Sequence, residues 1–164
     1  MNIDPKDLPT NSLMKWIAKL RIVVGLMFLT TWAINLVRGY YTPDGLLAFF
    51  QEFYPPAENP LSLYGTFISQ VILPIRGVFA PFQLVAEGLL AIGLLVGAFT
   101  PFFSLAGIFF LANTFLATLG HDWPWSYFVP MAILVVTFVT RAGRIQGIDA
   151  VLVRKFGERG RLFW

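Results

Sequence analysis

Four apolar stretches, each long enough to cross a lipid bilayer as a helix, limit what this chain can fold into. They cover residues 17–37, 77–99, 102–120 and 125–140. A hydrocarbon core about 30 Å thick takes about 17–25 helical residues, so the last and shortest stretch needs its flanking aromatic residues to reach the interface. Backbone groups in lipid must bond within the chain, and the stretches lack the alternation of barrel strands. The sequence therefore predicts an all-α integral membrane protein, a four-transmembrane-helix bundle.

Composition excludes the soluble classes of protein. Hydrophobic residues make up 57% of the 164 residues and charged residues 13%, against about 45–50% and about 25% in soluble domains. The mean hydropathy of +0.69 also excludes a disordered tail and a disulfide-stapled module. The chain has no cysteine and one histidine, which rules out thiolate-ligated metal centres and a bis-histidine haem. We expect no metal and no flavin to be bound by this chain alone.

The basic residues lie toward the two ends of the chain. Ten of the twelve Lys and Arg residues precede or open the first stretch or follow the fourth. Only Arg38 and Arg76 fall in the long loop 38–76. The positive-inside rule then places both termini in the cytoplasm, which requires an even number of spans. We expect one membrane domain, residues 1–164, in the cell inner (plasma) membrane, with a basic cytoplasmic tail at 141–164 and no nucleic acid partner.

The outer loop 38–76 is predicted to contain an interfacial helix. Thr42-Pro43-Asp44 is typical of a helix start, and the residues after it make an apolar surface too short to span. Residues 61–75 form a second uncharged stretch with three alternatives. It is re-entrant, it lies flat, or it is a fifth span that would separate the basic termini across the membrane. On the cytoplasmic side, Thr100-Pro101 is expected to form a tight turn between the second and third helices.

Aromatic residues cluster where the predicted helices meet the outer interface. Tyr40, Tyr41, Trp123, Trp125 and Tyr127 fall at this boundary. Trp and Tyr are enriched at both membrane interfaces because part of each ring system is apolar and part is polar. The simplest interpretation of these side chains is that they anchor the bundle in the bilayer.

Glu87 interrupts the second stretch about 15 Å from its start. A carboxyl group at that depth in lipid is energetically costly, so its presence indicates a structural or functional role. At helical spacing it shares a stripe of small or polar residues, which should face the other helices. We expect a neutral carboxyl group that donates a hydrogen bond. One interpretation is a proton-carrying or quinone-binding group; the other is interhelical bonding to a polar residue at similar depth. The candidates for that partner are Thr31, Trp32, Asn113 and Thr114.

Polar residues on two other stretches are candidates for the same site. Trp32 and Asn35 share one face of the first stretch. Asn113 and His121 share one face of the third, and Asp122 follows His121 directly. A His–Asp pair at the outer end could relay protons between a bound quinol and the outer aqueous phase. The alternative for His121 is a solvated contact with lipid headgroups.

Motifs of several enzyme classes are missing from the sequence. There is no P-loop, no G-x-S-x-G elbow, no H-E-x-x-H and no dinucleotide fingerprint after a strand. Hydrolase, kinase and self-contained dehydrogenase functions therefore have no support. The internal duplication that would favour a transporter is also missing.

Three short segments carry a family resemblance. They are Arg21-Ile-Val-Val-Gly25-Leu-Met-Phe28, Glu87-Gly-Leu-Leu-Ala-Ile-Gly93-Leu-Leu-Val-Gly97 and Gly143-Arg-Ile-Gln-Gly147-Ile-Asp149. Together they resemble the DoxX-like family of small four-helix membrane proteins, which includes the DoxD-type subunit of thiosulfate:quinone oxidoreductase. Asp149 takes the place of the aspartate that ends the family's glycine-rich turn. The chain departs from the family in its longer outer loop and in Arg38, where many relatives carry lysine.

The resemblance implies a membrane partner of redox proteins, often with quinone chemistry nearby. Our first hypothesis is a membrane subunit of a quinone-linked oxidoreductase complex that offers an apolar cleft to the quinone, with Glu87, His121 and Asp122 as catalytic groups. The candidate quinone-binding residues are Trp32, Asn35 and Asn113. The electron source would come from other subunits. The second hypothesis is a non-catalytic accessory subunit packed against a larger respiratory or photosynthetic complex, and the third is a small-solute carrier coupled through Glu87.

Overall fold

Four long helices form the framework of the protein. The computed structural model describes residues 10–157, and these residues form helices and turns without a strand. The long helices are α1 (Thr10–Val37), α4 (Arg76–Val96), α5 (Thr100–Ala117) and α6 (Trp125–Thr140). Each overlaps one of the predicted stretches, with ends that differ by a few residues except at α1, which begins seven residues early. The all-helical prediction is therefore confirmed for the described part of the chain.

Three of these helices can cross a membrane by length and composition. They are the segment Ser12–Val37 of α1, and α4 and α5 over their whole lengths. The fourth apolar helix, α6, is shorter, with 16 residues. These helices expose many large apolar side chains, such as Val78 and Phe109 at 76% and 71% exposure. Such surfaces suit contact with lipid.

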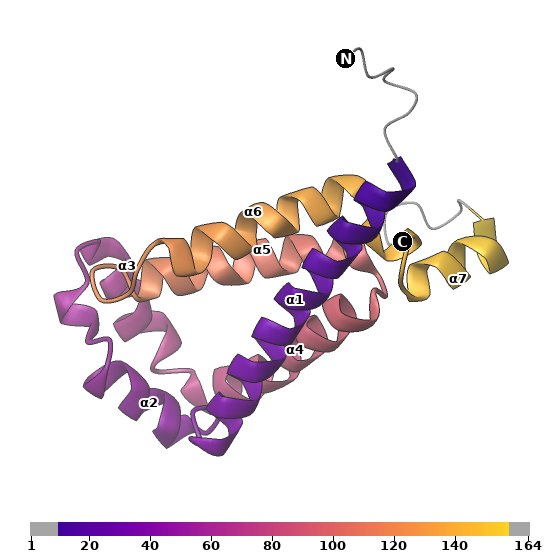
Figure 1. The fold of residues 1–164 in the computed structure, drawn as a ribbon. Helices are drawn as coiled ribbons and strands as arrows, with labels where there is room; N and C mark the ends of the chain where they lie inside the picture. Colours follow the sequence, from indigo (N-terminus) through magenta and orange to yellow (C-terminus); the bar gives the residue numbers. More distant parts are fainter. Residues whose placement is uncertain (1–9, 158–164) are drawn as a thin grey trace, which may run out of the picture.

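The helices are arranged as two antiparallel pairs that diverge from one end (Figure 1). In one pair α1 crosses α4 closely, because Gly25 has no side chain: a Cβ there would lie 2.7 Å from the Leu95 backbone nitrogen. In the other pair α5 lies along α6, where Gly107 packs against Leu134. The space between the pairs widens toward the end that carries α2 (Pro43–Glu52) and α3 (Ser62–Phe67).

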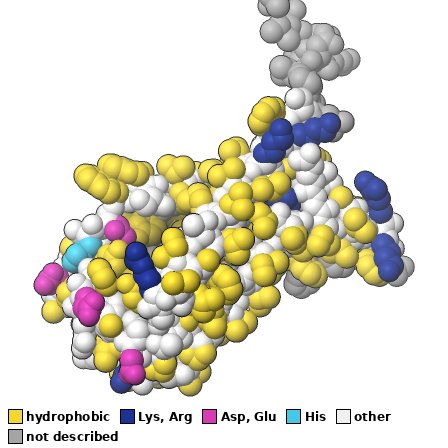
Figure 2. Space-filling view, turned by 60° about the horizontal axis from the view of Figure 1, so that its bottom comes forward, with side chains coloured by type: hydrophobic (Ala, Val, Ile, Leu, Met, Phe, Trp, Pro, Cys, Tyr) yellow, Lys and Arg dark blue, Asp and Glu magenta, His cyan; other side chains and the backbone are white. Residues whose placement is uncertain are grey.

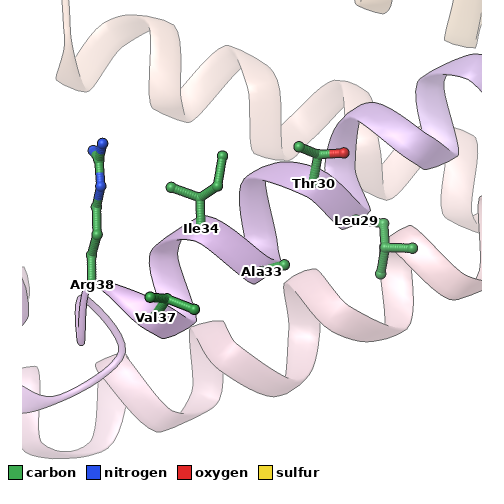
Figure 3. Close-up of a pocket in the computed structure, with 6 residues that line it drawn as sticks. All are labelled: Leu29, Thr30, Ala33, Ile34, Val37 and Arg38. Atoms are coloured by element: carbon green, nitrogen blue, oxygen red, sulfur yellow. The ribbon is translucent and has the colours of Figure 1, made fainter.

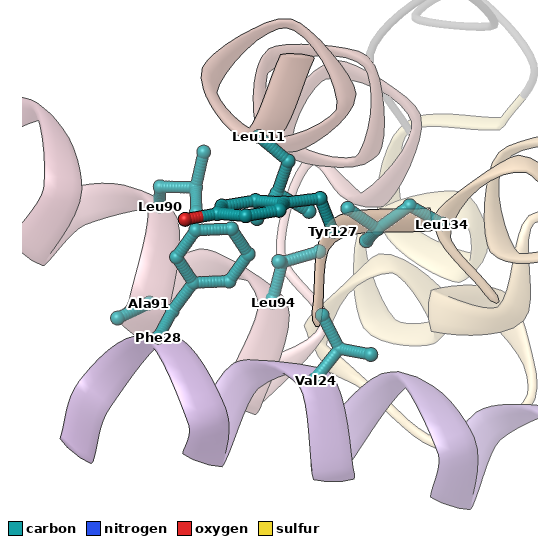
Figure 4. Close-up of a cluster of buried hydrophobic side chains, with 8 residues drawn as sticks. All are labelled: Val24, Phe28, Leu90, Ala91, Leu94, Leu111, Tyr127 and Leu134. Carbon is teal, nitrogen blue, oxygen red and sulfur yellow. The ribbon is translucent and has the colours of Figure 1, made fainter. Parts of the chain in front are cut away.

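A layer of apolar side chains joins the two pairs in the middle of the bundle (Figure 4). Phe28 of α1 and Leu94 of α4 meet Leu134 of α6 there, and all three are at least 95% buried. Phe28 also contacts Phe110 of α5 edge to face, with ring centroids 5.8 Å apart. Aromatic pairs in this geometry are attractive beyond the area they bury. This apolar layer separates the polar groups at the two ends of the bundle.

The outer loop contains the predicted helix, which packs on protein. Thr42 caps α2 by accepting a hydrogen bond from the Gly45 nitrogen at 3.0 Å, and Pro43 follows it as the first helical residue. On its inner side Leu46 and Phe50 are buried against Ala80 of α4. This contact joins α2 to the first turns of α4.

The stretch 61–75 is not a fifth spanning helix. It contains α3, with six residues, followed by a π-helical turn at Ile68–Ile72 with five. Together these are about 16 Å long, roughly half of a hydrocarbon core. A Cβ at Gly65 of α3 would overlap the Pro56 carbonyl oxygen, and the Tyr64 hydroxyl donates to the Asn113 carbonyl oxygen of α5 at 3.1 Å. The segment therefore fills the wide end of the bundle.

The turn between α4 and α5 lies three residues earlier than predicted. Gly97 follows α4 with φ at 67°, a left-handed conformation that glycine adopts without strain. Phe99 is also left-handed, with φ at 49°. The predicted turn residues Thr100 and Pro101 form the first turn of α5 instead. Proline is common there because it has no N–H to leave unbonded and its φ is already helical.

Asp149 fixes the segment after α6 to this turn. Its two carboxylate oxygens accept hydrogen bonds from the Phe99 and Thr100 nitrogens, at 2.7 and 2.9 Å. Its own nitrogen donates to the Gly97 carbonyl oxygen at 2.9 Å, and its side chain is fully buried. Arg21 of α1, 1% exposed, donates from Nη2 to the Gln146 carbonyl oxygen at 2.6 Å and interacts electrostatically with Asp149.

Part of the predicted basic tail is therefore folded onto the bundle. After α6 the chain forms a 3-10 turn at Ala142–Arg144 and then α7 (Ile148–Phe156). The glycines permit this, because a Cβ at Gly147 would lie 2.7 Å from the Gly97 carbonyl oxygen. Residues 158–164 of the predicted tail, like the N-terminal residues 1–9, lie outside the described residues.

Replacing Asp149 by alanine should destabilise the protein strongly. Asp149→Ala removes the acceptors of two buried N–H groups and leaves Arg21 without its counter-charge, so we expect a loss of about 3–5 kcal/mol. Asp149→Asn keeps an acceptor and should lose less. The matched control is Asp44→Ala, an exposed aspartate in the first turn of α2, with an expected loss below about 1 kcal/mol. Unfolding in detergent measures all three, and equal losses for the two alanine variants would contradict this account.

Candidate functional site

Glu87 is buried at the contact between α4 and the chain that follows α1. It is 1% exposed, and its Oε2 accepts a hydrogen bond from the Tyr41 hydroxyl at 2.6 Å. Tyr41 lies in the turn between α1 and α2 and is 6% exposed. The burial of Glu87 was predicted from the sequence, but its carboxyl group was expected to donate a hydrogen bond and instead accepts one from Tyr41, which had been assigned to the aromatic belt. The four residues proposed there as interhelical partners do not include the partner that Glu87 has.

Tyr41 is the centre of a small polar network. Asn35 of α1 interacts with the Tyr41 hydroxyl, and Gln83 of α4 interacts with the Glu87 carboxyl group. Burial raises the pKa of Tyr41 well above its usual value, and the hydrogen bond to Glu87 raises it further. The Tyr41 hydroxyl therefore keeps its proton at neutral pH and acts as the donor to Glu87.

Trp32 lies close to this network but bonds elsewhere. Its Nε1 donates to the Leu84 carbonyl oxygen at 2.9 Å. A Cβ on Gly88 would lie 3.1 Å from the same nitrogen, so the glycine lets the indole lie against α4. The structure thus brings the predicted site residues Trp32, Asn35 and Glu87 together through contacts that hold α1 against α4.

Asn113, the remaining predicted quinone-binding residue, belongs to a different contact. Its Nδ2 donates to the Phe109 carbonyl oxygen one turn earlier, at 2.7 Å. Its Oδ1 accepts a hydrogen bond from the Tyr64 hydroxyl at 3.0 Å. Asn113 therefore joins α3 to α5, and neither of these bonds links it to the Glu87 network.

Asp122 accepts hydrogen bonds from two tyrosine hydroxyl groups at the outer end of the bundle, and a threonine hydroxyl is joined to it through one of them. The Tyr127 hydroxyl of α6 donates to Asp122 Oδ2 at 2.6 Å, and the Tyr54 hydroxyl donates to both carboxylate oxygens at 3.2 and 3.3 Å. Thr118, just after α5, donates to the Tyr127 hydroxyl at 2.8 Å. Thr118 and Tyr127 are 3% and 7% exposed, whereas Asp122 is half-buried. We call Thr118, Tyr127, Asp122 and Tyr54 the outer hydroxyl cluster.

His121 lies beside this cluster and faces an exposed acid. Its Nε2 is 3.6 Å from Glu58 Oε2, and its ring meets the Tyr54 ring edge to face, with centroids 5.7 Å apart. The side chain of His121 is 28% exposed and that of Glu58 is 68% exposed. The structure thus brings His121 and Asp122 to one site, with Tyr54 in contact with both.

Three residues of the outer hydroxyl cluster, Thr118, Tyr127 and Tyr54, were not among the predicted site residues. Tyr127 was assigned to the aromatic belt, although its position five residues after Asp122 and nine after Thr118 places three polar side chains around one tight connection. Tyr54 comes from the segment after α2, and its approach to Asp122 depends on how the outer loop folds. Only Thr118 and Tyr127 carried a signal in the sequence, through their spacing from Asp122.

The environment of Tyr54 holds its hydroxyl in the protonated form. Partial burial and the neighbouring Asp122 carboxylate raise the pKa of Tyr54 to about 12. A negative tyrosinate beside a carboxylate would be repelled, and it would lose the hydrogen bond that it donates. At neutral pH Tyr54 is therefore a donor and Asp122 the acceptor.

A stability change at alkaline pH should follow from this pKa. The unfolded tyrosine loses its proton near pH 10 and the folded one near pH 12, so between these values the folded state binds more protons and stability falls as pH rises. Tyr54→Phe should make this alkaline loss shallower. Unfolding in detergent as a function of pH measures the slope, with Tyr40→Phe as the control. An unchanged slope in Tyr54→Phe would show that Tyr54 does not titrate this way.

A shallow apolar groove of about 480 Å³ follows the outer half of α1 (Figure 3). The Thr30 hydroxyl in the groove donates to the Leu26 carbonyl oxygen at 2.8 Å. Arg38 is the charged residue of the lining. The predicted residues Trp32 and Asn35 are not part of the lining, because they face α4 and Tyr41. The lining residues are Leu29, Thr30, Ala33, Ile34, Val37 and Arg38.

Removing the Tyr41 hydroxyl tests how the Glu87 network contributes to stability. Tyr41→Phe leaves a buried carboxyl oxygen without its donor, and we expect a loss of about 1–3 kcal/mol. Tyr40→Phe removes a hydroxyl from the neighbouring, less buried residue and should change stability by less than about 0.5 kcal/mol. Unfolding in detergent measures both variants. A Tyr41→Phe protein as stable as the control would mean that the bond to Glu87 has no net value.

Comparisons with known proteins give no match: no family model, no curated protein and no solved structure is similar to this chain. Within residues 10–157, no three His, Asp or Glu side chains lie close enough together to hold a metal ion. The family resemblance of the three segments stays a prediction, and the function is argued from the residues themselves.

Proposed function

We propose that the chain is a DoxX-like inner-membrane protein with four spans, α1, α4, α5 and α6, and with both termini in the cytoplasm. The 16 residues of α6 are about 24 Å long, and exposed Trp123 and Trp125 stack beside its outer end at 4.6 Å between ring centroids. Contacts along α5 from Gly107 to Phe115 keep α6 at the same depth as that spanning helix. The loop carrying α2 and α3 lies at the outer interface.

The charge distribution supports this orientation. In Figure 2 the acidic side chains gather at the end that carries the histidine, and most basic side chains in view lie at the opposite end. The described basic residues at that opposite end include Lys15, Lys19, Arg154 and Lys155. Basic residues are retained on the cytoplasmic side of membrane proteins.

In this membrane the chain acts as a subunit of a quinone-linked oxidoreductase complex. The observation that carries the proposal is the outer hydroxyl cluster, in which hydrogen bonds connect buried Thr118 and Tyr127 to Asp122 near the surface. A quinol that is oxidised gives up two protons with its two electrons. Asp122 and its hydroxyl donors form a short path along which such protons can leave on the outer side, with His121 and Glu58 beside it.

The roles proposed for three residues differ from those predicted from the sequence. Trp32, Asn35 and Glu87 act as positioning residues, since their polar atoms bond within the protein. The groove along α1 is the apolar cleft open to the bilayer and suits the apolar tail of a quinol. The electrons pass to a metal or flavin on another subunit, which is the partner that the proposal requires.

The carrier hypothesis is the least supported. A coupled carrier needs its polar groups to be reached from both sides in turn. Here the apolar layer around Phe28, Leu94 and Leu134 lies between the Glu87 network and Asp149 at the other end. These groups therefore suit chemistry on one side of the membrane.

The accessory-subunit hypothesis has one observation in its favour. Glu87 accepts a hydrogen bond from Tyr41 inside the protein. A carboxyl group with a purely structural role would be bonded in the same way. Glu87→Gln keeps an acceptor for Tyr41. It should therefore leave both turnover and assembly near normal if Glu87 positions α1, and it should abolish turnover with assembly intact if Glu87 contacts the quinone.

Substituting Asp122 tests the proposed function directly. In the isolated membrane complex, Asp122→Asn keeps the shape of the side chain but cannot take up a proton, so quinol oxidation should slow by about 100-fold or more. The control is Asp44→Asn, an exposed aspartate of α2 in the loop 38–76, which should leave the rate unchanged. Native mass of the complex and its quinone content are measured alongside.

Three results would contradict the proposal. They are an unchanged rate in Asp122→Asn, a rate loss that merely follows loss of assembly, and a wild-type complex that contains neither quinone nor a redox partner. The last result, with the chain bound in a large assembly, would establish the accessory function.

A further inference from the structure

The first turn of α7 is held rigidly at the end of the bundle. Asp149 bonds the nitrogens of Phe99 and Thr100, and Arg21 bonds the Gln146 carbonyl oxygen just before the helix. Asp149 and Arg21 are at least 99% buried. These bonds set the direction in which the remaining turns of α7 leave the bundle (Figure 1).

One face of α7 is apolar and exposed. Ile148 and Val151 are 44% and 59% exposed, and Phe156 is 50% exposed. With half-buried Leu152 they occupy positions i, i+3, i+4 and i+8, which lie on one side of a helix. Buried Asp149 faces the bundle, and half-buried Val153 follows it one turn later on the same side. With nine residues, about 14 Å, α7 is too short to cross a membrane.

Exposed cations accompany this apolar face. Arg154 and Lys155 lie in the last turn of α7, and Lys155 Nζ is 5.3 Å from the centre of the Phe156 ring. The beginning of α1, at the same end of the bundle in Figure 1, carries Lys19 with its Nζ 3.8 Å from the centre of the Trp16 ring. A cation beside an exposed aromatic ring is typical of the boundary between lipid tails and headgroups.

We propose that α7, which projects from the end of the bundle in Figure 1, docks on anionic phospholipid headgroups of the leaflet at this end. The end of a spanning bundle is at the level of a membrane surface, so the apolar face of α7 can enter the headgroup region. Arg154 and Lys155 then meet lipid phosphates. An apolar face of a partner protein would bury Ile148 and Val151 equally well but would leave both cations unpaired. The charges therefore favour the lipid surface.

Docking of α7 acts on the bundle through Asp149. The Asp149 carboxylate, in the first turn of α7, accepts hydrogen bonds from the Phe99 and Thr100 nitrogens where α5 begins. A lipid surface that fixes α7 therefore also fixes the turn between α4 and α5. A ligand that binds only the folded arrangement stabilises it. The membrane domain should therefore be more stable in a bilayer with anionic lipid than in a neutral one. This proposal depends on membrane insertion and is independent of the quinone function.

The chain has no cysteine, so single cysteines can report on α7 directly. Val151→Cys carries an environment-sensitive label on the exposed face, and Val153→Cys carries it on the face of Asp149. The protein is reconstituted into phosphatidylcholine vesicles with and without phosphatidylglycerol, and quenching by a lipid-attached quencher is measured. We expect quenching at position 151, more of it with phosphatidylglycerol, and much less at 153.

Charge removal completes the test. Arg154→Gln and Lys155→Gln should each weaken the preference for phosphatidylglycerol by about fivefold, and high salt should weaken it too. Arg38→Gln at the other end of the bundle is the matched control and should leave it unchanged. The proposal is wrong if lipid does not quench position 151, if phosphatidylglycerol makes no difference, or if the label is shielded only when another protein is bound.

Discussion

The carboxylate of Asp149 is the interaction on which the arrangement of the helices depends. Two N–H groups at the start of α5 have no helical turn before them to supply an acceptor. Asp149 accepts both, and Arg21 lies next to it as a compensating charge. Three segments far apart in sequence, α1, the α4–α5 turn and the segment before α7, are thereby joined at one point. Small residues at 97, 143 and 147 are required because the groups approach too closely for a Cβ.

Because the two helix pairs are close together at the end that carries Asp149, they are far apart at the opposite end. Because the two helix pairs meet around Asp149 and the Phe28 layer, they diverge outward, and the outer half of the bundle has to be filled by α2 and α3. The polar groups of the outer half come from these loops as much as from the long helices: Tyr41 and Tyr54 are both loop residues that reach carboxyl groups on other segments. The candidate site is therefore built where loop side chains meet the long helices.

This division explains how much the sequence could predict. Hydropathy identified the four long helices, and the stripe around Glu87 predicted its burial, because both depend on local periodicity. The turn at Gly97 was missed because Pro101 was taken as a turn residue although proline also begins helices. The partner of Glu87 could not be found from spacing, since Tyr41 lies 46 residues away and approaches only when α2 folds against α4. Tyr54 and Asp122 are 68 residues apart, and they also come into contact only through the folding of the outer loop.

The position of the apolar layer decides what kind of chemistry the bundle can support. The Glu87 network and the outer hydroxyl cluster lie on one side of it, and Arg21 with Asp149 lies on the other. Under the proposed function, a proton released on the side of Asp122 meets acceptors near the surface, whereas Arg21 and Asp149 are bonded to the backbone. Under the proposed function, the partner that takes the electrons approaches the half of the bundle that carries Asp122.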